Sequence, residues 1–251
     1  MMQLPASFFG RPIAHRALHD VTDGRPENSR AAIIAAVEAG YGIEIDLQLS
    51  ADHVPMVFHD YDLARLAEAT GPIQLQSASD LAAIPLRGGT EGIPSFAEVL
   101  DLVAGRVPLL VEIKDQDGGL GPDVGTLETA TAELIKDYDG DIAVMSFNPH
   151  AVVAMRDVLP DVPRGLVTCD YNVDDWPVVK ADVRERLADI PDFEAVEACF
   201  ISHDRNDLNS AAVARIKAAG YPVFTWTIRS PAQEAEARKI VDNVTFEQYL
   251  A

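Results

Sequence analysis

The stretch IEIDLQLSADHVPMVFHD, residues 43–60, contains two short strand patterns separated by a polar break at residues 50–52. In the first pattern Glu44 and Asp46 stand two positions apart among apolar residues, so both carboxylates share one face of the strand. The second pattern ends in His59 and Asp60. Two carboxylates on one strand and a histidine at the end of the next predict a metal site with an acid/base group beside it.

Further strand patterns lie on both sides of this stretch. One precedes it at residues 12–16, and others follow at residues 109–114, 142–147, 165–168, 198–202 and 223–228. Apolar residues at helical spacing separate most of them, at residues 31–39, 63–69, 96–103, 124–138, 149–158, 174–187, 210–219 and 231–238. Eight strand patterns that mostly alternate with helices predict an α/β fold, and a (β/α)8 or TIM barrel rather than a doubly wound sheet.

The missing helix between the second and third predicted strands is the one irregularity in this alternation, and a long connection follows the third strand. Residues 61–107 form a long connection with two helical stretches and several glycine and proline pairs. A connection of this length is more often a functional lid than a plain loop. We therefore expect one domain over residues 1–251, in which residues 61–107 are a lid-like insertion after strand 3.

The charge balance restricts the partners. Forty acidic and twenty basic residues give a formal net charge of −20, which argues against nucleic acid and anionic membrane surfaces as partners. An anionic substrate would therefore need a local cation cluster or a metal ion to hold it. No glycine-rich nucleotide-binding fingerprint follows the first strand, so no nucleotide cofactor is expected.

The compartment is inferred from the cysteines and the N-terminal residues. Cys169 and Cys199 are too few for a disulfide scaffold, and we expect both to be small buried apolar residues. Residues 1–12 lack the basic start and apolar core of a signal peptide, and no segment has eighteen consecutive apolar residues. These features predict a cytoplasmic protein with no stable membrane association.

Ionisable residues gather where the strands of the predicted barrel end, which is where catalytic side chains of such barrels lie. They are His15 and Arg16, Glu44 and Asp46, His59, and Glu112 and Lys114. Converging carboxylates repel one another unless positive charge lies among them. An all-oxygen ligand set indicates one divalent cation, Mg²⁺ or Ca²⁺, rather than zinc. The arginine and the lysine suit phosphate oxygens, and the two histidines can divide the proton transfers.

These residues belong to a longer series of short motifs. The series is His15-Arg16, Pro26-Glu27-Asn28-Ser29, Glu44 with Asp46, Val57-Phe58-His59-Asp60, Ile93-Pro94-Ser95 with Glu98-Val99-Leu100, Val111-Glu112-Ile113-Lys114, Ser146-Phe147 and Trp226-Thr227. In this order, and over nearly the whole chain, the motifs resemble those of the glycerophosphodiester phosphodiesterase family. Each motif is weak alone, but the series is specific.

The resemblance implies a barrel enzyme that uses one divalent cation to hydrolyse glycerophosphodiesters, small-molecule substrates, to sn-glycerol 3-phosphate and an alcohol. By their match to the family's motifs, Glu44, Asp46 and Glu112 are expected to bind the metal, and Glu27 to lie close to it. By the same match, His15 and His59 form the acid/base pair, and Arg16 and Lys114 contact the phosphate. The resemblance does not say which histidine is the base, or whether a cyclic phosphate forms first.

The sequence departs from the family pattern at two places on the predicted rim. Ala17-Leu18-His19-Asp20 leads into a longer loop where the family often has glycines. Near the end, Val244-Thr245-Phe246-Glu247 stands where a Thr-Asp or Thr-Asn step followed by proline is common. Both changes leave the preference for the alcohol leaving group open, and the oligomeric state is open too.

Two other functions fit the same scaffold. One is a related barrel phospholipase of the sphingomyelinase D or phosphoinositide-specific type, which needs a membrane-facing rim that this acidic chain does not show. The other is a catalytically silent binding protein, against which the presence of both His15 and His59 counts.

Some residues have a structural interpretation as well as a functional one. Glu27 lies near a helix start, where the helix dipole favours an acid whatever its function. Trp226 either lines the pocket or fills the barrel. The other histidines, His19, His53, His150 and His203, are expected on the surface.

Overall fold

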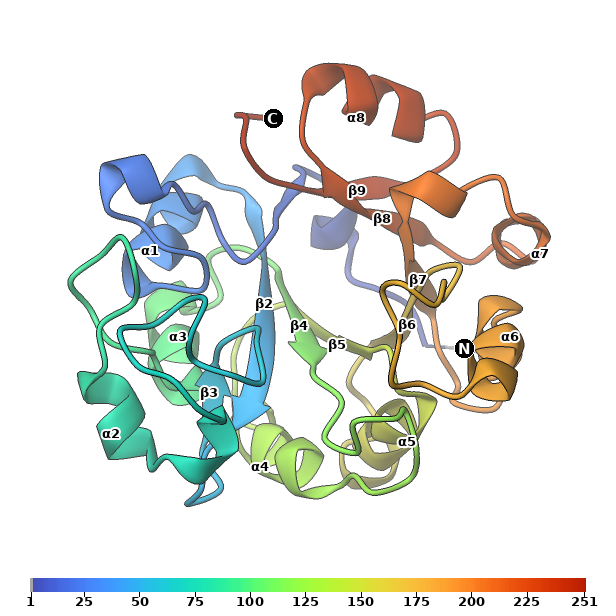
Figure 1. Ribbon diagram of the computed structural model, residues 1–251. Coiled ribbons are helices and arrows are strands. Elements are labelled where there is room, and N and C mark those ends of the chain that lie inside the picture. Colours follow the sequence, from blue (N-terminus) through green and yellow to red (C-terminus); the bar gives the residue numbers. More distant parts are fainter. Residues whose placement is uncertain (1) are drawn as a thin grey trace.

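The barrel expected from the sequence is present, and eight parallel strands close it. The computed structural model describes residues 2–251. The barrel strands are β1 (Ile13–Ala14), β2 (Gly42–Leu49), β4 (Leu109–Ile113), β5 (Ile142–Ser146), β6 (Arg164–Thr168), β7 (Phe200–Asp204), β8 (Val223–Ile228) and β9 (Asn243–Phe246). They pair in chain order, and β1 pairs with both β2 and β9. The closed ring is a TIM barrel (Figure 1).

Helices connect the barrel strands and surround the ring (Figure 1). They are α1 (Arg30–Ala39), α3 (Phe96–Val103), α4 (Thr126–Ile135), α5 (Pro149–Val158), α6 (Ala181–Ala188), α7 (Ala211–Ala218) and α8 (Pro231–Ala237). Most begin at a serine or asparagine whose side chain accepts a hydrogen bond from a backbone N–H of the first turn. At α3 this residue, Ser95, forms a complete capping box with Glu98.

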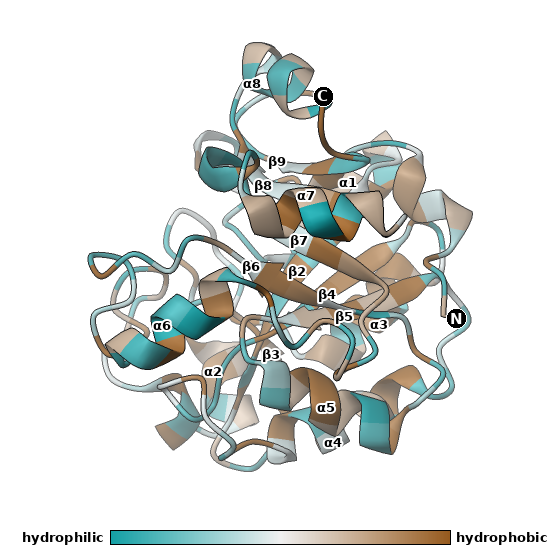
Figure 2. Ribbon diagram, turned by 90° about the vertical axis from the view of Figure 1, so that its right-hand side faces the viewer, coloured by the Kyte–Doolittle hydropathy of each residue, from teal (hydrophilic) through white to brown (hydrophobic). Residues whose placement is uncertain are grey.

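Alternation along the strands separates two apolar layers. On β2, Ile43, Ile45 and Leu47 pack in the core between strands and helices, so Glu44 and Asp46 face the barrel interior. A second core inside the ring contains Leu4, Phe8, Ile13, Leu110, Ala143, Met145, Val167, Cys199, Phe200 and Phe224. Figure 2 shows hydrophobic residues concentrated on the strands and hydrophilic ones on outer helices such as α6. Glu44 and Asp46 therefore face a barrel interior that is otherwise largely apolar.

The strand predicted third is not part of the barrel. It is β3 (Pro55–Val57), which pairs antiparallel with β2. Only residues 50–54 join the two strands, and a parallel connection needs a dozen residues or more. The chain therefore turns back on itself, with Ser50 Oγ accepting a hydrogen bond from the backbone N–H of Val54. His59 follows this antiparallel strand rather than a barrel strand.

The long excursion is the segment between β2 and α3, and it includes β3. It therefore begins and ends earlier than the insertion predicted at residues 61–107. Within it, residues 63–69 form turns instead of the predicted helix, and a short helix α2 (Ala78–Ala83) lies beyond them. The excursion buries its own apolar cluster of Met56, Phe58, Leu63, Ala67, Ile73, Leu81, Leu86 and Ile93. Helix α3 then packs against α1 and leads into β4, as an ordinary crossover helix does.

The eighth barrel strand is β9, which the sequence did not predict. It is only four residues long, and it alternates the outward Val244 and Phe246 with the inward Asn243 and Thr245. Helix α6 also starts seven residues later than predicted at 174, after the turns around Pro177. Among residues 2–251, no helix combines the length and the apolar character needed to cross a membrane.

Candidate active site

A small cavity lies at the C-terminal end of the barrel strands, where the sequence predicts the active site. Its volume is about 60 Å³, and its lining residues are His15, Arg16, Glu44, Asp46, His59, Glu112, Lys114, Met145, Phe147, Val167, Ser202, Trp226 and Thr245. These include all the residues predicted for acid/base catalysis, phosphate contact and metal binding, together with Trp226. We call this space the inner cavity.

Three buried carboxylates form one wall of the inner cavity. Glu44, Asp46 and Glu112 are at most 7% exposed, and each offers an oxygen within 4.8 Å of the others. Their placement follows from the strand register, because Asp46 of β2 lies directly beside Glu112 of β4. Neighbours in a parallel pair point to the same side of the sheet, so the carboxylates converge.

Two cations lie among these carboxylates. Lys114 Nζ is 2.7 Å from Glu112 Oε1 and 3.5 Å from Asp46 Oδ1, and Arg16 Nε is 3.6 Å from Asp46 Oδ2. The backbone N–H of Arg16 donates to Glu44 Oε2 at 2.8 Å. Arg16 has a φ of 51°, in the left-handed region, and this turn aims its amide at the carboxylate.

The cluster shifts its pKa values in opposite directions. Burial, with the charges of Asp46 and Glu112, raises the pKa of Glu44 well above its usual range. Burial would raise the pKa of Asp46 too, but the charges of His59, Lys114 and Arg16 hold it well below its usual range. Glu44 thus favours its protonated form, whereas Asp46 stays ionised.

These residues fit a divalent cation. Three carboxylates supply the hard oxygen ligands that Mg²⁺ and Ca²⁺ prefer. Asn28 lies beside them: its Nδ2 donates to Asp46 Oδ2 at 2.9 Å, while its buried Oδ1 has no hydrogen-bond partner within residues 2–251. A cation bound here would favour ionised Glu44 and so offset the repulsion that raises its pKa.

Glu27 lies outside this cluster. Its Oε1 accepts a hydrogen bond from Arg16 Nη1 at 2.6 Å, and Arg65 is 3.3 Å away on its other side. Burial would raise the pKa of Glu27, but the two arginines lower it. The structure therefore places Glu27 as the partner of Arg16, one side chain removed from the three converging carboxylates.

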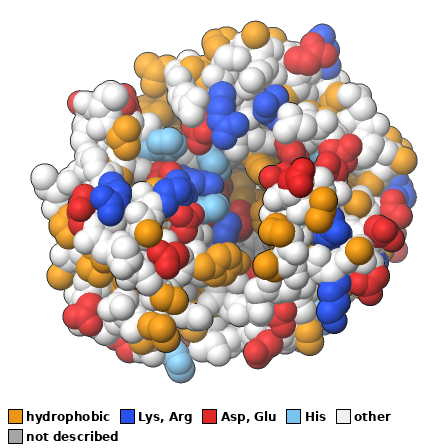
Figure 3. Space-filling model, in the orientation of Figure 1, with side chains coloured by type: hydrophobic (Ala, Val, Ile, Leu, Met, Phe, Trp, Pro, Cys, Tyr) orange, Lys and Arg blue, Asp and Glu red, His pale blue; other side chains and the backbone are white. Residues whose placement is uncertain are grey.

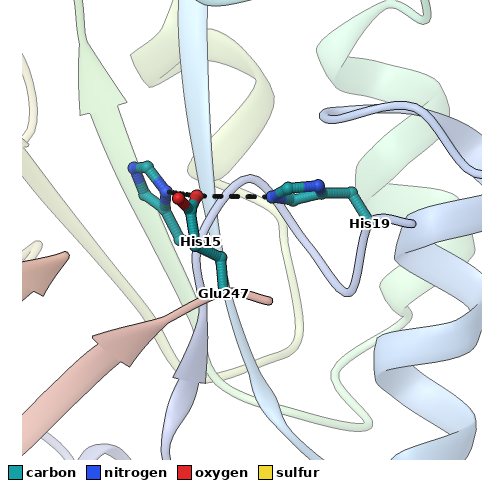
Figure 4. A group of neighbouring side chains, drawn as sticks. All are labelled: His15, His19 and Glu247. Carbon is teal, nitrogen blue, oxygen red and sulfur yellow. Dashed lines mark hydrogen bonds and ion pairs between the residues drawn. The ribbon is translucent and has the colours of Figure 1, made fainter. Parts of the chain in front are cut away.

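His15 is held by a carboxylate from the far end of the chain (Figure 4). Its Nδ1 lies 2.7 Å from Glu247 Oε2, whose carboxylate also faces His19 Nε2 at 3.4 Å and Arg229 Nε at 2.7 Å. Burial lowers the pKa of His15, and the hydrogen bond to Glu247 partly opposes this. Burial would raise the pKa of Glu247, but its histidine neighbours keep it well below the usual range.

His59 has a carboxylate partner as well. Its Nδ1 is 2.6 Å from Asp60 Oδ1, and Arg65 binds the same Asp60 carboxylate at 2.6 Å. The Asp60 pKa lies well below its usual range, because hydrogen bonds from His59 and Arg65 outweigh its burial. Both histidines are therefore oriented through Nδ1, which leaves Nε2 of each for a reacting group.

A wider space, the outer cavity, adjoins the inner one. Its volume is about 580 Å³, and His59, Glu112, Lys114, Phe147 and Trp226 line both. The rest of its wall comes from the segments that follow β3, β4 and β6 and from the C-terminal ends of β7 and β8 with the segments after them, including Trp176, Asp170, Asp175 and Asp204. Figure 3 shows the hollow on this face, with histidine and basic side chains on one side and acidic and hydrophobic ones on the other.

Comparison with known proteins agrees with the arrangement of the site. A family model described as the glycerophosphoryl diester phosphodiesterase family matches residues 15–245. The chain belongs to this family.

Relatives of the glycerophosphoryl diester phosphodiesterase family match over different lengths. YhdW of Bacillus subtilis, provisionally named a glycerophosphodiester phosphodiesterase, is 25% identical over 92% of both chains. Glycerophosphodiester phosphodiesterase 1 of Bos taurus is 30% identical over 62% of this chain, and the match spans about half of that protein, 48%. A phosphodiesterase structure from Oleispira antarctica, in complex with the product sn-glycerol 3-phosphate, covers 97% of this chain and 94% of its own with a TM-score of 0.78 at 24% identity. This last likeness establishes the shared fold.

In this member of the glycerophosphoryl diester phosphodiesterase family, two histidines do not lie on the surface as the sequence predicts. His203 is fully buried, with Nδ1 2.8 Å from Thr168 Oγ1, because β7 extends two residues beyond its predicted end. His19 is half-buried beside Glu247, so its prediction as a surface residue is also wrong. His53 and His150 are exposed, and Cys169 and Cys199 are buried, as predicted.

Sequence reasoning gave no role to several residues that contact the site. Asn28, Asp60 and Glu247 each contact a predicted site residue. For Asn28 and Asp60 a signal existed, because both lie within the quoted family motifs. Glu247 had no such signal, since it appeared only as a departure from the family pattern.

Proposed function

We propose that this protein hydrolyses glycerophosphodiesters to sn-glycerol 3-phosphate and an alcohol, with one divalent cation, Mg²⁺ or Ca²⁺, held by Glu44, Asp46 and Glu112. The observation that carries the proposal is the inner cavity of a phosphodiesterase-family chain, where two carboxylate-oriented histidines and two cations surround three carboxylates. The Oleispira structure, which holds the product glycerol 3-phosphate, supports this choice of substrate.

Arg16 and Lys114 bind the phosphate in this proposal. Each lies beside the carboxylate cluster. Burial alone would lower the pKa of both side chains, but the neighbouring carboxylates raise it above its usual range, so both stay charged. Fixed cations stabilise the charge on the phosphoryl oxygens as the transition state forms. A divalent cation would supply Lewis-acid polarisation of a phosphoryl oxygen when bound.

His15 and His59 move the protons. One removes a proton from the attacking water, or from a glycerol hydroxyl whose cyclic phosphate product water then opens, and the other gives a proton to the oxygen of the departing alcohol. Both stand at the inner cavity, and each has a carboxylate on Nδ1 that fixes its ring. The outer cavity, which adjoins the inner one at His59 and Trp226, receives the alcohol half of the substrate.

Release of glycerol 3-phosphate from a panel of glycerophosphodiesters tests this function. We expect turnover by the native protein and a loss of about 10²-fold or more in kcat for His15→Ala and for His59→Ala. His150→Ala is the matched control, because His150 is exposed and lines neither cavity. If native protein releases no glycerol 3-phosphate, or both variants keep full activity, the proposal is wrong.

A further inference from the structure

Two residues that line the inner cavity carry buried hydroxyl groups without a hydrogen-bond partner. Ser202 of β7 and Thr245 of β9 are 0% and 1% exposed, and among residues 2–251 neither Ser202 Oγ nor Thr245 Oγ1 has a partner. Both residues line the inner cavity. Such groups are rare in native proteins, because a buried hydroxyl without a hydrogen bond costs free energy.

Strand alternation explains why these side chains point inward. Ile201, next to Ser202, packs in the core between strands and helices, and so do Val244 and Phe246 on either side of Thr245. The period of two therefore turns Ser202 and Thr245 towards the barrel interior. In that interior most neighbouring residues are apolar, so a serine and a threonine contribute little to packing there.

The proposed reaction does not use these hydroxyls. The carboxylates and the cations come from β1, β2 and β4 and the residues that follow them, and both histidines are oriented by carboxylates. Ser202 and Thr245 face the same cavity from β7 and β9. Along the ring, Met145 of β5 and Val167 of β6 lie between Glu112 of β4 and Ser202 of β7 and supply apolar wall. A ligand with hydroxyls on a short hydrocarbon skeleton matches such a lining.

The volume of the inner cavity fits the smaller end of a ligand. A volume of about 60 Å³ holds roughly four to six water molecules, at about 10–15 Å³ each. This accommodates the hydroxyl-bearing end of a glycerol unit, whereas the outer cavity offers about 580 Å³ for a larger group. The glycerol half of a substrate thus has a matching space at the inner cavity, and the variable alcohol has one outside.

We propose that Ser202 and Thr245 form a polyol-binding subsite, in which their hydroxyls hydrogen-bond the free hydroxyl groups of the glycerol half of the substrate. The assignment deepens the proposed function and rests on it for the identity of the polyol. A site built to hydrogen-bond a substrate hydroxyl discriminates strongly against an analogue that lacks it, because the protein hydroxyl then stays buried without a partner.

Calorimetric binding of two small phosphates tests the subsite without requiring turnover. The ligands are sn-glycerol 3-phosphate and 3-hydroxypropyl phosphate, which lacks the secondary hydroxyl, each with Mg²⁺ present. The proteins are native, Ser202→Ala, Thr245→Val and the control Thr131→Val. Thr131 on α4 is the matched control, because its hydroxyl is also fully buried and without a partner but lies outside both cavities.

We expect native protein to bind glycerol 3-phosphate about tenfold or more tightly than the deoxy analogue. In Ser202→Ala or Thr245→Val this preference falls to within about threefold, and in Thr131→Val it stays native. Unfolding by urea shows that each variant is folded, and no protein group loses a hydrogen-bond partner in any of them.

Two results would overturn the subsite: equal binding of the two phosphates by native protein, or a preference that both cavity variants keep. Neither depends on catalysis. If glycerol 3-phosphate binds with the expected preference but no glycerophosphodiester is hydrolysed, the subsite stands and the proposed hydrolysis fails.

Discussion

Nδ1 of His15 lies 2.7 Å from Oε2 of Glu247, although the two residues are 232 positions apart in the chain. The contact exists because β9 pairs with β1 and closes the barrel, which brings the residue after β9 beside the residue after β1. A carboxylate on Nδ1 fixes the tautomer of the histidine and stabilises its protonated form. Glu247 is therefore positioned to act through His15.

Replacing Glu247 by Gln should lower kcat by about 10- to 100-fold, part of the roughly 10²- to 10⁴-fold that a positioned acid/base group contributes. KM should change little, because Glu247 lines neither the inner nor the outer cavity. The hydrogen bond to Glu247 raises the pKa of His15, so its loss lowers that pKa further. The limb of the pH–kcat profile that reports His15, the acidic limb if His15 is the base and the basic limb if it is the acid, should therefore move to lower pH.

Glu247→Asp is the companion variant, because it keeps the charge on a shorter side chain and should retain more activity than Gln. A pH–kcat profile with both limbs unmoved in Glu247→Gln would show that Glu247 has only a structural role.

Glu44→Gln should change how stability responds to pH and to divalent cations. The pKa of Glu44 is raised by burial and by two neighbouring carboxylates, so native protein without a cation loses stability as pH rises above the ordinary value near 4.5. A pKa that is higher by one in the folded than in the unfolded protein corresponds to a loss of about 1.4 kcal/mol. The variant has no proton to lose there, so without a cation it should be the more stable protein at pH 8.

Added Mg²⁺ or Ca²⁺ should reverse this order. Cation binding stabilises native protein by about 2.7 kcal/mol at a hundred times Kd, whereas Glu44→Gln lacks one ligand and should gain less. Urea unfolding with and without the cation measures both effects. Equal cation-induced stabilisation of the two proteins would remove Glu44 from the ligand set.

Substitution of Asn28 should destabilise the protein for two reasons that different variants separate. It has a φ of 59° and donates a buried hydrogen bond to Asp46. Asn28→Ala loses the hydrogen bond and also strains the left-handed backbone, for a total of about 2–4 kcal/mol. Asn28→Gly loses only the hydrogen bond and should unfold at a higher denaturant concentration than Ala. Equal midpoints for the two variants would mean that the backbone conformation is unimportant.

Asp60→Asn should affect catalysis more than stability. Asp60 and Arg65 are partly exposed, and such ion pairs contribute about 0–1 kcal/mol to folding. The substitution removes the charge from the partner of His59 Nδ1 and should lower kcat by about tenfold or more. The exposed pair of Arg87 and Glu68 is the control, and Arg87→Ala should leave kcat unchanged. A native kcat in Asp60→Asn would show that His59 needs no partner.

Most of the barrel and much of the cavity lining could be predicted from short-range patterns. The period of two put Glu44 and Asp46 on one face whatever the rest of the chain does, and the same rule placed Glu112 and Lys114. Parallel strands then bring their C-terminal ends to one end of the barrel. These steps need only the strand assignment, which apolar residues make visible.

The features that were missed depend on pairing between distant segments. Pattern alone does not give strand direction, so the apolar run at residues 55–57 predicts a barrel strand, although its five-residue link to β2 excludes a parallel crossover. The short β9 has polar residues at its inward positions, so it lacked the apolar run that marked the other strands. Without β9, Glu247 had no visible partner, and its contact with His15 could not be inferred.

In the proposed function, the three converging carboxylates hold a divalent cation that hydrolysis of glycerophosphodiesters requires. Native protein stripped with a chelator and returned to chelator-free buffer can be titrated with Mg²⁺ or Ca²⁺ while ³¹P NMR follows glycerophosphocholine and glycerol 3-phosphate. We expect no release of glycerol 3-phosphate before the cation is added, and turnover that rises to a plateau as it is added. Undiminished turnover by the stripped protein would contradict the proposed role of the cation.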